Sequence, residues 1–201
     1  MIGIFGGSFD PVHNGHLANA LAIQKTLNLS ALYLMPCANP VHKDGLMFSN
    51  QARLDMLELA CQATPLQIDR REIDRQGDSY TIDSLIEIKH EYPETPVCLI
   101  MGADSFLQFD TWKRYQDFSQ YCHLVVIDRP DSMLTHQSAF GFTLSHDADA
   151  FHQQANSLIW FDKGEMLNIS SSEIRGKIAR HEELTGLVPA SVINYLQTTW
   201  T

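Results

Sequence analysis

The sequence predicts an α/β protein with a parallel sheet, helices on both faces of the sheet, and a small helical part at the C-terminus. Three observations predict this class. Short apolar runs of strand length alternate with segments whose apolar residues recur at helical spacing. Glycine or proline follows most of the apolar runs, as expected where strands end. The chain has no internal repeat, and strands separated by helical segments favour right-handed crossovers between parallel strands.

Six apolar runs are predicted to be strands because each is short, continuous and bounded by turn residues. In chain order they are residues 2–5, which end at two glycines; 31–35, which end at Pro36; 66–68; 97–101, which end at Gly102; 124–127, which end at Arg129-Pro130; and 158–161. Between and after them lie the segments of helical spacing. These are residues 15–27; 49–63, with Ser49 as N-cap; a helix through Ile82 to Ile88 capped by Ser79 or Thr81; 106–118, interrupted near Thr111; 170–180; and 189–196, which begin with a proline.

These elements predict a Rossmann-like fold, a doubly wound parallel sheet in one domain over residues 1–201, whose C-terminal helical part covers about 170–201. Residues 131–157 fit no regular element. Ligands of such sheets bind at the carboxyl ends of the strands. The loops at 6–16, 36–45, 102–112 and from 129 onward all follow strands, so we expect them to face one crevice.

Composition narrows the function classes. The chain of 201 residues carries 14 basic and 24 acidic side chains, a net charge of −10, which disfavours binding to nucleic acid or to an anionic membrane. No apolar run approaches the roughly 18 residues of a membrane span, and the first residues lack the basic region of a signal peptide. The cysteines form no C-x-x-C pair, so we expect reduced thiols in a cytoplasmic protein; they are Cys37, Cys61, Cys98 and Cys122.

The segment from Gly6 to His16 reads G-G-S-F-D-P-V-H-N-G-H and connects a predicted strand to a predicted helix. The free N–H groups and the dipole at a helix start attract phosphate, and Gly6 and Gly7 allow a ligand to approach the backbone. His13 and His16 share one face of the first turn, and Gly15, which stands between them in the sequence, leaves room for a ligand against the backbone. The segment contains neither G-x-G-x-x-G nor G-x-x-x-x-G-K-[ST], and no third ligand near the histidines favours zinc.

A second segment, I-S-S-S-E-I-R at 169–175, also begins a predicted helix. Ser170 and Glu173 have the spacing of a capping box, which by itself indicates only a well-capped helix. Its hydroxyls, its N–H groups and Arg175 are also suited to holding a polyphosphate.

Together, H-x-G-H and I-S-S-S-x-x-R resemble the nucleotidylyltransferase superfamily, whose members transfer a nucleotidyl group from a nucleoside triphosphate to a phosphate acceptor. Within it, residues 1–130 and 158–196 are similar to the bacterial nicotinate-nucleotide adenylyltransferases. The further pieces that carry this resemblance are N-P-V-H-K at 39–43, S-Y-T-I-D-S-L at 79–85, G-A-D-S at 102–105, Thr111-Trp112 and Arg129-Pro130. The chain departs from the family pattern at Ser8, where threonine is usual, and at the third serine, Ser172.

The resemblance implies an enzyme that moves AMP from ATP to nicotinate mononucleotide, with His13, His16 and Arg175 as catalytic residues. The residues implied to bind ATP are Gly6, Gly7, Ser8, Phe9, His16, Gly102, Asp104, Ile169, Ser170, Ser171 and Arg175. Those implied to bind the mononucleotide are Asn39, Lys43, Tyr80, Thr81, Trp112 and Arg129. Mg²⁺ is expected with ATP, not on a metal site of the protein. The protein would act as a monomer or homo-oligomer.

The chemistry needs no general base, because a phosphate monoester has a second pKa of about 6 and is mostly dianionic at pH 7. We therefore expect in-line attack on the α-phosphorus without a covalent intermediate. Alternatives remain: a relative with another acceptor, such as nicotinamide mononucleotide or phosphopantetheine; a non-catalytic nucleotide-binding module; and a class I aminoacyl-tRNA synthetase fragment, which the acidic charge disfavours.

Overall fold

The structure is a computed structural model of the chain and describes residues 1–38, 45–75, 78–128, 140–163, 167 and 169–199. Its centre is a parallel sheet in which the described strands follow the order β3-β2-β1-β4-β5-β7-β6. The strands are β1 (Ile2–Gly7), β2 (Ala31–Pro36), β3 (Gln67–Ile68), β4 (Val97–Gly102), β5 (His123–Ile127), β6 (Thr143–Leu144) and β7 (Leu158–Asp162). All six predicted strands are present.

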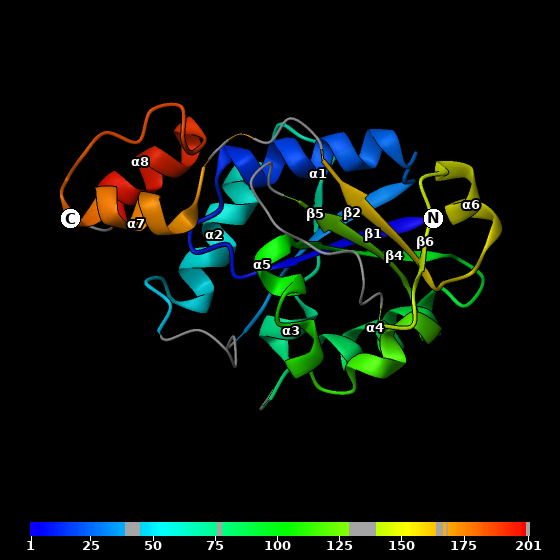
Figure 1. Cartoon of the computed structure of the whole chain (residues 1–201). Coiled ribbons are helices and arrows are strands. Elements are labelled where there is room, and N and C mark those ends of the chain that lie inside the picture. The colour runs from blue at the N-terminus through cyan, green and yellow to red at the C-terminus, as the bar shows by residue number, and fades with distance from the viewer. Residues whose placement is uncertain (39–44, 76–77, 129–139, 164–166, 168, 200–201) are drawn as a thin grey trace.

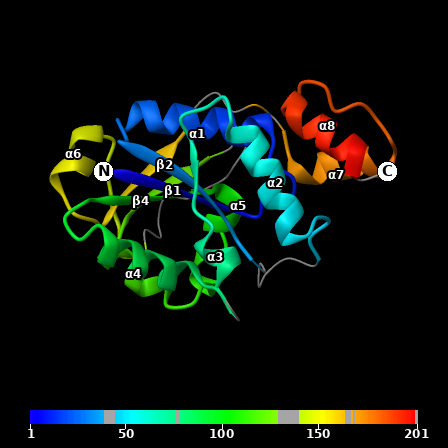
Figure 2. The same cartoon turned by 180° about the vertical axis from the view of Figure 1, so that it is seen from behind.

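Helices cover both faces of this sheet. They are α1 (Asn14–Thr26), α2 (Asn50–Cys61), α3 (Arg71–Asp74), α4 (Thr81–Glu91), α5 (Ala103–Phe106), the 3₁₀ turns η1 (Phe109–Thr111) and η2 (Tyr115–Gln120), α6 (Ala148–Gln153), α7 (Ser171–Ala179) and α8 (Ala190–Thr199). Figures 1 and 2 show α1 along one face and α4 along the other. The predicted doubly wound α/β fold is therefore confirmed. None of the described helices has the length and apolar character needed to cross a membrane.

Two apolar cores, one on each face of the sheet, hold these layers together. One core receives buried residues of α1, α2, α6, α7 and α8, and the other receives those of α4, α5 and the two 3₁₀ turns. Buried Ile174 of α7 and Val192 of α8 lie in the same core as Leu17 of α1. The C-terminal helices are thus packed into the main body of the fold, at the end opposite the N-terminus of β1 (Figure 1).

Several local predictions need correction. Helix α4 has Tyr80 as its N-cap and no side-chain cap, so the expected cap by Ser79 or Thr81 is wrong. The Ser79 hydroxyl instead accepts a hydrogen bond of 2.6 Å from Arg75. The helical stretch expected over 106–118 is divided into α5, η1 and η2, and Arg114, with φ of 53°, has the left-handed conformation just before η2. Helix α3 and, within 131–157, the elements β6 and α6 are not expected from the sequence.

The cysteines match the expectation of reduced packing residues. None of the four forms a disulfide, and three of them, Cys61, Cys98 and Cys122, are buried. Burial raises the pKa of these three thiols above the usual value, which keeps them protonated and unreactive.

The strand order indicates where on the sheet a ligand would bind. β1 has β2 and then β3 on one side and β4 on the other. After β3 the chain therefore crosses back over β1 and adds its next strands on the other side, which makes the gap between β1 and β4 the switch point of the sheet. Ligands of doubly wound sheets bind at such a switch point, outside the carboxyl ends of the strands. β1 ends at Gly7 and β4 ends at Gly102, and both belong to segments that the sequence singled out.

His123 is a fully buried histidine outside that edge, and it predicts a pH dependence of stability. Its Nε2–H donates to the Gln154 carbonyl (3.1 Å) and its Nδ1 accepts from the Leu158 N–H (3.2 Å), so the neutral ring is satisfied. Burial lowers its pKa from 6.5 to about 4. The unfolded chain therefore binds more protons between these values. The stabilisation is complete above pH 6.5 and is lost as pH falls towards 4.

We expect the free energy of unfolding to fall by about 3 kcal/mol over this range through His123. Urea unfolding of the His123→Gln variant should show a smaller loss between pH 6.5 and 4. His90→Gln, which replaces an exposed histidine of α4, is the matched control. An unchanged pH profile for His123→Gln would contradict the assignment.

Candidate active site

A cavity of about 470 Å³ lies at the switch point of the sheet, a volume typical of small-molecule sites. It is lined by residues of both segments that the sequence predicts to bind phosphate, 6–16 and 169–175. The lining residues are Phe5, Gly6, Gly7, Ser8, Asp10, His13, Gly15, His16, Asn19, Gly45, Leu46, Gly102, Ala103, Asp104, Ser105, Ile127, Leu167, Ile169, Ser170, Ser171, Ser172 and Arg175. The expectation that the two helix starts share one cavity is confirmed.

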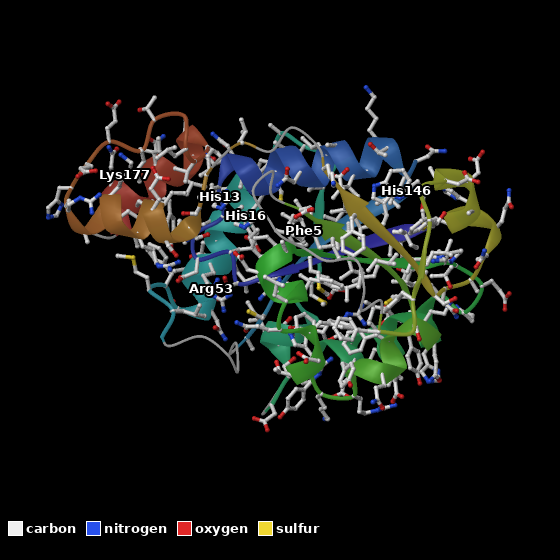
Figure 3. All side chains as sticks on the ribbon, in the orientation of Figure 1. Phe5, His13, His16, Arg53, His146 and Lys177 are labelled. Atoms are coloured by element: carbon white, nitrogen blue, oxygen red, sulfur yellow. The ribbon has the colours of Figure 1, made fainter. Side chains whose placement is uncertain are left out.

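His13 and His16 cap the start of α1 reciprocally. The His13 Nδ1 accepts from the His16 N–H (3.2 Å), and the His16 Nδ1 accepts from the His13 N–H (3.3 Å). The two rings stack with centroids 3.6 Å apart. Figure 3 labels the two side chains next to each other. Because each Nδ1 is an acceptor, the proton of each neutral ring lies on Nε2. Both residues line the cavity, and in this tautomer Nε2–H is the donor that each ring can offer to a ligand.

His13 is 5% exposed, and burial lowers its pKa from 6.5 to about 4. It is therefore neutral at pH 7. His13 can hydrogen-bond an oxyanion through its Nε2–H without carrying a positive charge.

Glycine has a different role at Gly15 and at Gly6. A Cβ on Gly15 would lie 3.0 Å from the His13 Nδ1, so Gly15 makes room for the imidazole. Gly15 also lines the cavity, so its contact with the imidazole adds to the expected role beside a ligand. A Cβ on Gly6 would meet nothing within 4 Å, so a ligand can approach the backbone there as expected.

Gly7, which lines the cavity, packs against the Phe9 ring, which does not. A Cβ on Gly7 would lie 3.1 Å from the Phe9 ring, so at Gly7 the missing side chain accommodates Phe9. The Phe9 side chain is 1% exposed, and its ring centroid lies 5.0 Å from that of His16. Phe9, expected to contact ATP, therefore supports the His16 ring from the core instead of lining the cavity.

Several hydrogen-bond donors from other segments hold the loop between β1 and α1 in place. The buried Asp10 carboxylate accepts from the N–H groups of Met47 (3.0 Å) and Phe48 (2.9 Å). The Asp10 carbonyl accepts from Arg175, and the Pro11 carbonyl accepts from the Ser171 hydroxyl (3.2 Å). The first loop is thereby tied to the start of α7.

Helix α7 brings the second segment to the cavity. Ser170 is its N-cap, and its hydroxyl oxygen accepts from the Glu173 N–H (3.1 Å), which is one half of the predicted capping box. The Nη1 of Arg175 donates to the Asp10 carbonyl (2.8 Å), and its Nη2 donates to the Ser172 hydroxyl (3.0 Å). A guanidinium has five donors, and these bonds use two of them. Arg175 is therefore placed to bridge both loops and a ligand.

The end of β4 forms the opposite wall. Gly102 is the N-cap of the short helix α5, and Asp104 is the second residue of that helix. A Cβ on Gly102 would also meet nothing within 4 Å, which leaves the backbone open to a ligand. Asp104 is exposed and lines the cavity from the second position of α5.

The residues expected to bind the mononucleotide lie elsewhere. Asn39, Lys43 and Arg129 fall outside the described residues. Tyr80 and Trp112 are partly buried against the core on the α4 face, and they are not among the residues that line the cavity. The Lys113 ammonium lies 4.1 Å from the centre of the Tyr80 ring and 3.2 Å from the Asp83 carboxylate. The segment that contains Trp112 therefore lies beside the start of α4, whose first residue is Thr81.

The structure adds residues that sequence reasoning missed. Asn19 lines the cavity three residues after His16, and this helical spacing could have revealed it. Leu46 and Leu167 are apolar lining residues without a sequence signal. Arg53 is buried beneath the first loop, and its position among the apolar residues of α2 gave no indication of a role. Among the described residues, no group of three or more His, Cys, Asp or Glu is placed to hold a metal ion.

Residues 4–177 match the family model described as cytidylyltransferase-like. The chain belongs to this family. It is 49% identical over 197 residues to a probable nicotinate-nucleotide adenylyltransferase of Vesicomyosocius okutanii, covering 98% of this chain and 93% of the relative. It is 39% identical to the protein of the same name from Psychromonas ingrahamii over 201 residues, 98% of this chain and 94% of the relative. The nicotinate-nucleotide adenylyltransferases are thus the branch of the family to which the chain belongs.

Solved structures show the same fold. A nicotinic acid mononucleotide adenylyltransferase of Plasmodium falciparum, complexed with NaAD, superposes with a TM-score of 0.72 at 17% identity, covering 98% of this chain and 94% of that one. A putative nicotinate-nucleotide adenylyltransferase of Vibrio parahaemolyticus superposes with a TM-score of 0.65 at 16% identity, covering 98% and 97%. At these identities the likeness shows the fold alone.

Proposed function

We propose that the protein transfers AMP from ATP to nicotinate mononucleotide, giving nicotinate adenine dinucleotide and pyrophosphate, as the names of its relatives indicate. The observation that carries the proposal is the meeting of two helix starts, α1 and α7, in one cavity at the switch point. Helix starts attract anions through free N–H groups and the helix dipole. Two of them facing one cavity suit a polyphosphate chain.

On the ATP side, the positive potential has to be local because the chain carries a net charge of −10. Arg175 supplies a guanidinium, and His13 and His16 supply Nε2–H donors at the start of α1. We assign the histidines to the α-phosphate and the start of α7, with Arg175, to the β- and γ-phosphates. Gly6 and Gly102 leave open backbone for the rest of the nucleotide.

The reaction follows from this placement. An oxygen of the acceptor phosphate attacks the α-phosphorus, and the bond from that phosphorus to the oxygen that bridges to the β-phosphate breaks. The electron pair of that bond leaves with pyrophosphate, so no proton has to be moved by the protein. The residues accelerate the step by positioning and by stabilising charge on the transferring and leaving phosphates.

Mg²⁺ fits this site as part of the ATP substrate. The described residues offer no cluster of three ligands, and the buried Asp10 carboxylate already accepts two backbone hydrogen bonds. Mg²⁺ is commonly held by substrate phosphates with few protein ligands. It would neutralise phosphate charge, while Arg175 and the helix starts orient the chain.

For the acceptor we propose the region between the start of α4 and Trp112. Tyr80 caps α4 without a side-chain hydrogen bond, so the first N–H groups of the helix have no side-chain acceptor at their cap. Such a helix start suits a carboxylate, and an indole next to it suits the pyridine ring. Asn39, Lys43 and Arg129 remain proposed contacts from the sequence resemblance.

The test is pyrophosphate release from Mg-ATP with one acceptor at a time. We expect the highest kcat/KM with nicotinate mononucleotide and product of the mass of nicotinate adenine dinucleotide. Higher turnover with nicotinamide mononucleotide or phosphopantetheine would overturn the acceptor. ATP binding without pyrophosphate release with any acceptor would overturn the enzymatic function. The four free cysteines are compatible with action in the cytoplasm, where we expect the enzyme.

Trp112→Ala should raise the KM for nicotinate mononucleotide about 10-fold and leave the KM for ATP near its wild-type value, because one ring–ring contact is lost. Trp112 also contacts Phe109 and Phe118, so kinetics should be measured well below the melting temperature. Trp112→Phe, which keeps an aromatic ring, is the matched control. An equal rise in both KM values would show a packing role only.

A further inference from the structure

Arg53 lies in the first turns of α2, is fully buried, and makes four hydrogen bonds, three of which go to backbone carbonyls outside the helix. Its Nη1 donates to the Ser8 carbonyl (2.6 Å). Its Nη2 donates to the carbonyls of Cys37 (2.7 Å) and Ala38 (3.2 Å) and to the side-chain oxygen of Asn50 (2.8 Å). Figure 3 shows Arg53 on the same side of the molecule as His13 and His16.

The burial of this guanidinium is unfavourable by itself. No carboxylate of the described residues lies within 4 Å of it, and its Nε has no hydrogen-bond partner there. Burial lowers the pKa of Arg53, while Cys37 and Asp10 oppose that shift. A buried charge without an ion-pair partner is destabilising unless hydrogen bonds compensate it. A position chosen for stability alone favours an apolar side chain, as at the neighbouring Leu54.

The three carbonyls belong to two segments that leave the sheet side by side. Ser8 follows β1 and begins the loop that carries His13, and Cys37 and Ala38 follow β2. β1 and β2 pair in register up to Gly7 and Pro36, and the Cys37 N–H donates to the Gly7 carbonyl (3.0 Å). One planar guanidinium thus joins the phosphate loop to the segment that leads into residues 39–43, where the proposed function places acceptor contacts.

We propose that Arg53 is a positioning residue that sets the ATP loop and the acceptor segment at a fixed separation for transfer. This inference rests on the proposed function. Arg53 does not line the cavity, so it acts on substrates only through Ser8, Cys37 and Ala38.

The proposal predicts how two substitutions differ. Arg53→Lys keeps the positive charge but lacks the planar guanidinium with its fixed donor directions. The ammonium can therefore hydrogen-bond well to one of the two segments but not to both. Arg53→Met removes the charge and every hydrogen bond. We expect kcat/KM to fall about 10-fold for Lys and further for Met, because misplaced reacting groups lower rates steeply. The Kd for ATP, measured alone by calorimetry, should rise together with the KM for the mononucleotide.

Leu57→Val is the matched control, because Leu57 is a fully buried residue one turn further along α2. It should lower the melting temperature without changing either substrate constant. A structural role only would leave kcat and both KM values of Arg53→Lys within about twofold of wild type below the melting temperature, which overturns the proposal. A wild-type protein that releases no pyrophosphate refutes the proposed function instead. Calorimetry with ATP then still tests Arg53, and an unchanged Kd in Arg53→Lys overturns its role.

Discussion

Replacing His16 by glutamine should lower kcat by about 10²- to 10³-fold, the effect of removing one donor that stabilises an oxyanion. Glutamine at the third helical position can reach back to the N-cap N–H, as in a capping box. His16→Gln therefore keeps the hydrogen bond that the His16 Nδ1 accepts from the His13 N–H. It replaces the imidazole Nε2–H, which we assign to the α-phosphate, by an amide NH₂ on a flexible chain that the ring contacts of His16 no longer hold in place.

The companion variant is His13→Asn. Asparagine is a favoured N-cap, so its side-chain oxygen can replace the His13 Nδ1 that accepts from the His16 N–H. Both variants should melt within a few degrees of wild type and lose most of their turnover. Since His13 is neutral at pH 7, the loss in His13→Asn should not depend on pH between 6.5 and 8. His90→Gln again serves as the control, and pyrophosphate release at saturating substrates is the measurement. Near wild-type kcat in both variants would limit the histidines to helix capping.

Replacing Arg175 by methionine should lower kcat/KM for ATP by about 10- to 100-fold, the effect of losing charge-assisted hydrogen bonds of about 1.5–3 kcal/mol. Arg175 touches both phosphate segments, through the Asp10 carbonyl and the Ser172 hydroxyl, so its loss also loosens their junction. Arg175→Lys should recover only part of the activity, because an ammonium lacks the planar fork.

Arg180→Met is the control for Arg175. Arg180 lies just after the same helix, is exposed, and pairs with Glu182. It should leave both substrate constants unchanged. The KM for the mononucleotide should change little in Arg175→Met. A selective rise in that constant would place Arg175 on the acceptor side and contradict its assignment to ATP.

Regular elements were predictable from the sequence where a single physical effect decides them. Parallel strands covered on both faces are continuous apolar runs, so β1, β4 and β5 were evident. Ser49 and Ser170 were identified as N-caps because a hydroxyl before an apolar-periodic segment has a local partner. The same reasoning failed at α4, where Arg75 takes the Ser79 hydroxyl that was expected to cap the helix.

Some site residues were likewise recognisable from the local sequence, and others were not. The segments containing His13 and Arg175 were recognisable as phosphate-binding because their residue types and spacing suffice for that chemistry. The reasons for Gly7 and Gly15 were not, because the atoms that fill their space, the rings of Phe9 and His13, reach them only in the folded chain.

By itself, the sequence determined the alternation of strands and helices, the two helix starts suited to phosphate, and the family resemblance, because each depends on residues close together in the chain. Only the tertiary structure decided that Arg175 reaches the Asp10 carbonyl 165 residues away, that His13 is buried and neutral, and that Arg53 joins two loops. Burial and hydrogen-bond partners of a polar side chain depend on segments distant in the chain, and these meet only when the sheet has assembled.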